Sequence, residues 1–180
     1  MSNGQRVPPH SIEAEQSVLG SMLLDANAVM LAMETLTESD FYSPGHQKIF
    51  AAMADLNSDG QAVDLVTVLE KLNQQGTLDS AGGMEYLTTL SGLVPTTANV
   101  SQYIKIVEDR SVLRSVIQAG SQMMASGFEA EKPADDVVAD AHDAVYALAM
   151  RNRTDSLKPL KEGVAEALVR VAEAAQRGGG

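Results

Sequence analysis

The three histidines of this sequence are the first candidates for a metal-binding site. His10, His46 and His142 lie far apart in the chain, and none has a histidine or carboxylate four residues away. Zinc sites on helices need such partners on the same face. The sequence therefore favours histidines that are solvated or satisfied by local hydrogen bonds, and it predicts no metal site, no catalytic residue and no cofactor-binding residue.

Four aspartates form the second candidate site, because Asp135, Asp136, Asp140 and Asp143 lie on and around one face of a predicted helix. The positive end of a helix dipole favours anions in the early turns, so a solvated acidic face is expected. The alternative is a small helical metalloenzyme that uses Asp136 and Asp140. Hydrolytic activity in metal-supplemented buffer would separate the two interpretations.

Adjacent glycines, Gly82 and Gly83, suggest a phosphate-binding loop at first sight. A Walker A loop requires a buried strand before the glycines and a Lys-Ser or Lys-Thr pair after them, and the sequence has neither. We therefore expect a turn between two helices.

Hydrophobic periodicity and capping residues predict an all-α protein, and its first part reads as a compact N-terminal helical bundle. Ser11, Ser43 and Asp64 are expected N-caps, and Gly76 is expected to end a helix in the left-handed conformation. The predicted helices of this part cover about residues 12–24, 27–36, 44–56, 65–75 and 84–90.

A protruding antiparallel helical hairpin is predicted to follow the bundle. Its first helix is expected over about residues 98–125, broken by Gly127, and Pro133 opens the second. At ~1.5 Å per residue the first helix spans roughly 40 Å, which is longer than a small core requires. We expect it to extend beyond the globule.

The last part of the sequence predicts an amphipathic helix. Its apolar positions recur every three or four residues, and they are Leu157, Leu160, Val164, Leu168, Val171 and Ala175. Full burial would stabilise each larger side chain by ~1.5 to 3 kcal/mol, so we expect this face to dock on another protein. The alternative is that it folds back onto its own globule.

Composition limits the classes of function. The chain has 180 residues with a formal net charge of −11, and a surface of that sign repels nucleic acid phosphates. It has no cysteine and no apolar run long enough to span a bilayer, which predicts a cytoplasmic protein. These features indicate an acidic helical module for protein interaction.

Nine methionines exceed the usual number. We expect core filling at Met22, Met30, Met33 and Met53. For Met123 and Met124, which are adjacent in the hairpin, core filling and contact with a partner helix both remain open, because flexible thioether side chains suit both roles.

Four stretches resemble one protein family. They are PPHSIEAEQSVLGSMLLD from Pro8, DFYSPGHQKIFAAM from Asp40, DLVTVLEKL from Asp64 and VPTTANVSQYIKIVEDRSVLR from Val94. Together they are similar to the N-terminal domain of bacterial replicative DNA helicases of the DnaB type. The tail from Leu157, LKPLKEGVAEALVRVAEAAQRGG, resembles the linker helix of that family.

The resemblance implies a parent protein with a RecA-like ATPase domain, which uses ATP and Mg²⁺ to unwind duplex DNA in the 5′ to 3′ direction as a hexameric ring. The chain stops where that ATPase domain would begin. We therefore expect a non-enzymatic fragment of a helicase. The alternative is a stand-alone helical adaptor that regulates a helicase, and continuation of the gene into a Walker A motif would distinguish them.

The resemblance also implies partners. N-terminal domains of this family pair through their globular parts and hairpins into a trimer of dimers, and this ring recruits the C-terminal domain of primase, with a helicase loader as a further candidate. The positions matching the primase contacts are Glu13, Tyr86, Ile117, Met123 and Met124. Alternatively, Tyr86 and Ile117 belong to the core and Glu13 only favours its helix N-terminus.

By the same resemblance, the linker helix docks on the ATPase domain of a neighbouring subunit through Leu160, Val164, Leu168 and Val171. The expected domain boundaries are a flexible N-terminus at 1–10, a globular helical domain at 11–110, the hairpin at 111–150, a hinge at 151–158 and the linker helix at 159–177.

Overall fold

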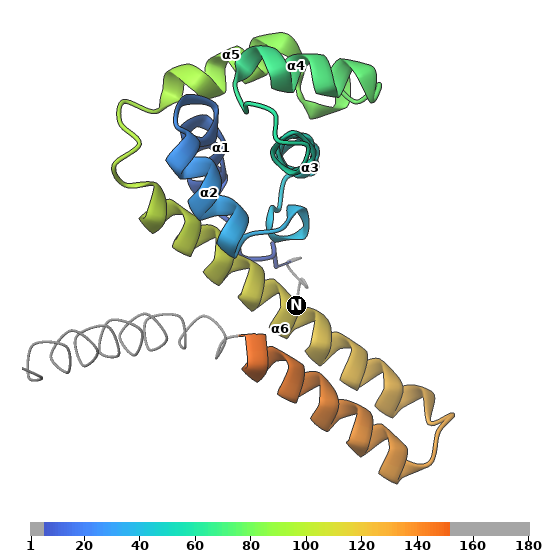
Figure 1. Ribbon diagram of the computed structural model, residues 1–180. Coiled ribbons are helices and arrows are strands. Elements are labelled where there is room, and N and C mark those ends of the chain that lie inside the picture. The colour runs from blue at the N-terminus through green and yellow to red at the C-terminus, as the bar shows by residue number, and fades with distance from the viewer. Residues whose placement is uncertain (1–5, 152–180) are drawn as a thin grey trace, which may run out of the picture. The chain divides into compact units, whose positions relative to one another are not determined.

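The computed structural model describes residues 6–151, in which all regular secondary structure is helical. Six helices carry labels in Figure 1, and a further helix covers residues 134–151. The labelled helices are α1 (Ile12–Leu24), α2 (Ala26–Thr35), α3 (Pro44–Ser58), α4 (Leu65–Gln74), α5 (Gly83–Leu93) and α6 (Val100–Glu129). Short 3-10 turns at Glu38–Asp40 and Asp79–Ala81 lie between them. The all-α prediction is confirmed.

The chain divides into two compact units, and the boundary lies inside α6, after Arg114. The first unit contains α1 to α5 and the beginning of α6. The second contains the rest of α6 and the helix over residues 134–151. The predicted linker helix and all but the first residue of the predicted hinge lie outside the described residues, as do Leu160, Val164, Leu168 and Val171.

One hydrophobic core holds the first unit together. In it α1 packs against α2 and α5, and α3 packs against α4. The largest completely buried apolar side chains are Leu19, Met22, Phe41, Ile49, Phe50, Met53, Leu72, Leu87 and Leu90. Burial of each such side chain contributes ~1.5 to 3 kcal/mol, so this core is the main source of stability in the unit.

The contact between α1 and α5 depends on Gly20. A Cβ atom at this position would lie 2.5 Å from the carbonyl oxygen of Leu90 and 2.7 Å from Val94 Cγ2. Helix α5 can therefore approach the backbone of α1 only because the residue there has no side chain.

Local capping explains where several helices begin. Ser11 accepts a hydrogen bond from the backbone N–H of Ala14 at 3.2 Å, and Asp64 accepts one from Thr67 at 3.0 Å. The Thr67 hydroxyl oxygen accepts the backbone N–H of Asp64 in return, which completes a capping box. Gly76 has φ +68°, as expected for a glycine that ends a helix. The predicted caps at Ser11 and Asp64 are thus confirmed.

Two expectations are wrong. Helix α6 does not break at Gly127 but continues to Glu129, and the chain turns at Ala130, which has φ +51°. A glycine inside a helix costs only about 1 kcal/mol relative to alanine, and the neighbouring turns outweigh that cost. Met30, expected in the core, is 59% exposed because it lies on the outer face of α2.

The second unit is a helical hairpin, with residues 130–133 joining α6 to the following helix. Lys132 Nζ donates a hydrogen bond to Asp140 Oδ2 at 2.7 Å, and this carboxylate raises the pKa of Lys132. The contact ties the turn to the second helix. Within residues 6–151, no helix combines the length and apolar character that crossing a bilayer requires.

Candidate protein-docking site

The five positions matched to partner binding have different environments. Glu13 is exposed in the first turn of α1, and Tyr86 is half-buried in α5. Ile117 and Met124 are exposed on α6, whereas Met123 is half-buried. The hairpin unit thus carries three of the positions, and the first unit carries the other two.

An exposed apolar stripe runs along the hairpin part of α6. Ile117 is 51% exposed, Met124 63% and Phe128 85%. Their spacing of seven and four residues puts them on one helical face. We call Ile117, Met124 and Phe128 the outer stripe. Gly120 also falls on this side of the helix, and a Cβ atom there would have no neighbour within 4 Å.

The sequence reasoning missed Phe128, which is the most exposed apolar residue of the stripe. The signal that could have found it is its position four residues after Met124. Removing such exposed apolar surface from water is favourable, so the outer stripe is suited to binding another protein.

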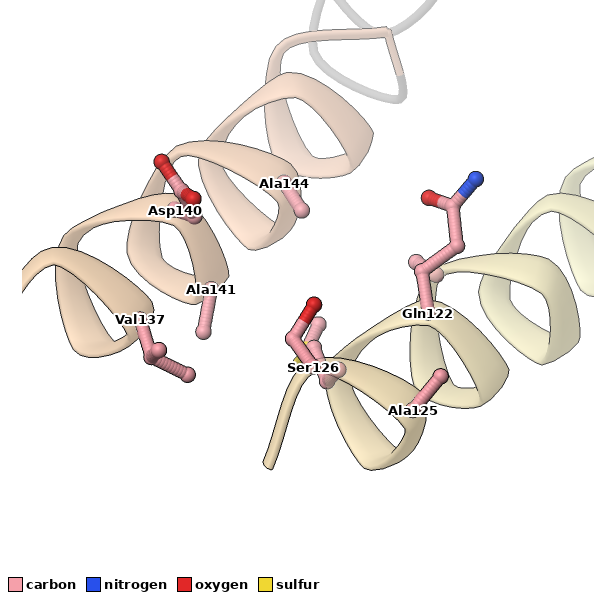
Figure 2. Close-up of a pocket in the computed structure, with 9 residues that line it drawn as sticks. Gln122, Ala125, Ser126, Val137, Asp140, Ala141 and Ala144 are labelled. Carbon is pink, nitrogen blue, oxygen red and sulfur yellow. The ribbon is translucent and has the colours of Figure 1, made fainter. Parts of the chain in front are cut away.

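Met123 points to a different surface from its neighbour Met124. Successive helical residues are rotated by about 100°, and Met123 lines a groove of about 360 Å³ between the two helices of the hairpin. In Figure 2, Val137 and Ala141 of one helix lie across this groove from Ser126 of α6. The two methionines therefore face different sides of α6.

Part of the Tyr86 side chain makes contacts inside the first unit. Its hydroxyl oxygen lies 2.7 Å from His46 Nε2 and 3.1 Å from Gln16 Nε2. The rings of Tyr86 and His46 are nearly parallel, with centroids 5.9 Å apart. The hydroxyl end is thus satisfied internally, and the residue as a whole is still partly exposed.

His46 is bound to a buried carboxylate. Its Nδ1 atom lies 2.6 Å from Glu15 Oε2, and both side chains are almost completely buried. Glu15 also accepts the backbone N–H groups of Tyr42 at 2.6 Å and Ser43 at 3.3 Å. His46 is therefore a satisfied histidine, as the sequence favoured, but its partner lies 31 residues away and was not anticipated.

A second buried carboxylate ties α6 to the rest of the first unit. Asp40 Oδ1 accepts a hydrogen bond from the Ser111 hydroxyl at 2.6 Å, and Oδ2 accepts the backbone N–H of Thr37 at 2.7 Å. Arg114 donates to the carbonyl oxygens of Pro9 at 2.8 Å and Asp40 at 2.6 Å. These contacts hold α6 against the segments that flank α1 and precede α3.

The four aspartates of the hairpin, Asp135, Asp136, Asp140 and Asp143, are all exposed. Among residues 6–151 there is no group of three or more histidine, aspartate or glutamate side chains arranged to hold a metal ion. Asp140 is instead paired with Lys132.

The sequence matches the family model described as the DnaB-like helicase N terminal domain over residues 7–109. This match covers more than half of the chain. The chain belongs to the DnaB-like helicase N-terminal domain family. The matched residues contain α1 to α5, the buried Glu15–His46 pair and the first part of α6.

Relatives of the DnaB family agree with this match. The chain is 40% identical over 157 residues to "Replicative DNA helicase DnaC" of Bacillus subtilis (strain 168), covering 87% of this chain and 35% of that protein. The chain therefore spans about a third of the length of such relatives.

Two solved DnaB structures are also similar. The N-terminal domain of DnaB helicase from Mycobacterium tuberculosis is 39% identical with a TM-score of 0.74, covering 79% of this chain and 99% of that one. A DnaB-like replicative helicase, solved in a study of its interactions with primase, is 29% identical with a TM-score of 0.63. That match covers 74% of this chain and 31% of that one.

Proposed function

We propose that this chain is the N-terminal oligomerisation and primase-docking domain of a replicative DNA helicase. The parent protein would unwind duplex DNA 5′ to 3′ with ATP and Mg²⁺ bound by its ATPase domain. This chain would supply protein contacts and no catalysis. Membership of the DnaB-like family and the reported primase interactions of a related helicase support the proposal.

The observation that carries the docking role is the outer stripe. Three large apolar side chains, Ile117, Met124 and Phe128, are exposed on one face of α6, and two of them are positions that the family resemblance matched to primase binding. Burial of such side chains would contribute ~1.5 to 3 kcal/mol each to association. Glu13, Tyr86 and Met123 are proposed as further primase contacts.

The test is light scattering coupled to size exclusion, on the chain alone and mixed with the helicase-binding domain of the cognate primase. A mass above that of the monomer, and a further increase on mixing, are expected. Met124→Asp should weaken at least one of these associations, because a carboxylate in the outer stripe would have to be desolvated.

The matched control is Gln118→Asp, which places the same charge at an exposed position of the same helix away from the outer stripe. This variant should associate like the wild type. A wild-type chain that stays monomeric and does not bind the primase domain would contradict the proposal.

A second contact is proposed for the predicted linker helix, through Leu160, Val164, Leu168 and Val171, with the ATPase domain of a neighbouring subunit. Leu168→Asp in the full-length parent should disrupt hexamers seen by native mass spectrometry, whereas the same change in this chain should leave its circular dichroism unchanged. Intact hexamers in the parent variant would contradict this contact.

A further inference from the structure

We infer that Glu15 and His46 are positioning residues, which fix the ring of Tyr86 in the orientation that a partner protein meets. Neither residue can touch the partner, because each is only 1% exposed. The inference rests on the proposed docking function, and it assigns a purpose to the buried pair Glu15 and His46, neither of which is a proposed docking contact.

The ring of Tyr86 is restrained from several sides. Its hydroxyl is hydrogen-bonded to His46 and Gln16, and the imidazole ring of His46 lies nearly parallel to it. On a third side is Gly82, where a Cβ atom would lie only 2.6 Å from Tyr86 Cδ1. Gly82 also has φ +110°, which favours glycine. These contacts leave the half-buried ring little room to change rotamer.

The donor and acceptor of each hydrogen bond in the network are assigned starting from the Glu15 carboxylate. An ionised Glu15 can only accept, so the N–H of His46 is assigned to Nδ1, facing the carboxylate. With a neutral imidazole, Nε2 then accepts the hydroxyl hydrogen of Tyr86. The Tyr86 oxygen in turn accepts from the Gln16 amide. Each hydrogen bond in this chain then has one donor and one acceptor.

The chain of hydrogen bonds is anchored to the backbone. Glu15 in α1 accepts the N–H groups of Tyr42 and Ser43 immediately before α3, and His46 stands in the first turn of α3. Tyr86 belongs to α5. Three helices are thus linked by four side chains, two from α1 (Glu15 and Gln16) and one each from α3 and α5, so the position of the Tyr86 ring is set by the core and not by its own exposed surface.

Such preorganisation has a measurable consequence. A side chain that is already immobilised loses less conformational freedom when a partner binds, and the saving for one rotamer-rich side chain corresponds to roughly 2- to 10-fold in affinity. Loss of the Glu15–His46 pair should therefore weaken primase docking even though the ring of Tyr86 remains.

The experiment compares Glu15→Gln and His46→Phe with Ser111→Ala. Ser111→Ala removes another buried hydrogen bond of the same unit, the one to Asp40, which does not touch Tyr86. Affinity for the helicase-binding domain of primase is measured well below the melting temperature of every variant. Glu15→Gln and His46→Phe should bind roughly 2- to 10-fold more weakly, and Ser111→Ala should bind like the wild type.

A second readout is independent of binding. In the wild type, the Tyr86 hydroxyl proton should give a slowly exchanging NMR signal because it is held by His46, and this signal should be lost in His46→Phe. If the hydroxyl signal and the Tyr86 ring signals are the same in wild type and His46→Phe, the ring does not depend on the network, and the inference is overturned.

The binding outcomes separate this inference from the proposed function. Equal weakening by all three variants would show a general effect of core stability and overturn the inference. Wild-type affinity in Glu15→Gln and His46→Phe, together with weak binding by Tyr86→Ala, would overturn it and leave docking intact. Undiminished binding by Tyr86→Ala would remove Tyr86 from the docking surface and the inference with it. No binding by the wild type would overturn both.

Discussion

At the level of single side chains, Glu15 and His46 form a buried pair of ionisable residues in the first unit. Both are nearly inaccessible to water, and the carboxylate accepts three hydrogen bonds, from His46 and two backbone N–H groups. Taking a carboxylate out of water is costly unless such donors replace its hydration. Removing either residue of the pair should therefore lower the free energy of unfolding, because its partner stays buried without a hydrogen-bonding group.

Glu15→Ala should destabilise the first unit by about 3 to 5 kcal/mol, because it leaves the imidazole of His46 and two backbone N–H groups buried without their acceptor. Urea unfolding followed by circular dichroism measures this loss. Glu13→Ala is the control, since Glu13 is exposed on the same helix, and it should change the free energy of unfolding by less than about 1 kcal/mol. Equal effects would contradict the buried-pair account.

Two glycines allow a second test of single-residue effects on stability, because Gly20 lies in a close helix contact whereas Gly92 has open space around it. Gly20→Ala forces a Cβ against the Leu90 carbonyl oxygen and should cost about 1 to 3 kcal/mol of unfolding free energy. A Cβ atom at Gly92 would meet no other atom within 4 Å, so Gly92→Ala should be neutral or stabilise by about 0.5 to 1 kcal/mol. Thermal melts of both variants measure these changes. A loss of stability in Gly20→Ala alone would show that position 20 requires glycine because of the close helix contact and not because of helix propensity.

Helix α6 is the element that differs most from expectation. It has 30 residues, and its last part lies in the hairpin unit, beyond the point at which Gly127 was expected to end it. Gly127 lies inside α6, its φ is not positive, and a Cβ atom there would have no neighbour within 4 Å. Its only direct effect on the stability of α6 is then the loss of backbone entropy when a glycine becomes helical.

Gly127→Ala should accordingly stabilise the end of α6 by up to about 1 kcal/mol. Hydrogen exchange of backbone amides is the suitable measurement, because it reports the hairpin separately from the first unit. Amides near residue 127 should exchange up to roughly fivefold more slowly, while those of α1 should not change. Faster exchange near residue 127 would mean that the glycine has a structural role that the helix geometry does not reveal.

At the scale of the whole molecule, the net charge of the chain disfavours binding to nucleic acid. The formal net charge is −11, with 24 acidic and 13 basic residues. Nucleic acid binding relies on Lys and Arg that neutralise phosphates and release counterions. The acidic residues of the hairpin, apart from the Lys132–Asp140 pair, give a surface of the wrong sign for that purpose.

The chain should therefore not bind single-stranded DNA at about 0.15 M ionic strength, where a Debye length of about 8 Å still leaves near-surface repulsion. Fluorescence anisotropy of a labelled oligonucleotide measures this directly. A saturable increase that weakens steeply with added salt would show phosphate contacts and contradict a purely protein-binding role.

Much of the fold was predictable because its signals are local. Ser11 and Asp64 cap helices through groups three residues away, and apolar side chains recur at helical spacing, so the helices follow from neighbouring residues. The outer stripe was predictable in part for the same reason. Ile117 and Met124 share a face by spacing alone, and Phe128 follows the same rule although it was overlooked.

Tertiary structure decided everything that depends on residues far apart in the chain. No local pattern pairs Glu15 with His46 or places Tyr86 against His46, which is 40 residues away. Which of two neighbouring methionines is covered depends on where the second hairpin helix lies, so Met123 lines the groove and Met124 stays exposed. Periodicity in the sequence fixes which residues share a helix face. Only packing determines which face is buried, because a face is removed from water only where another element covers it.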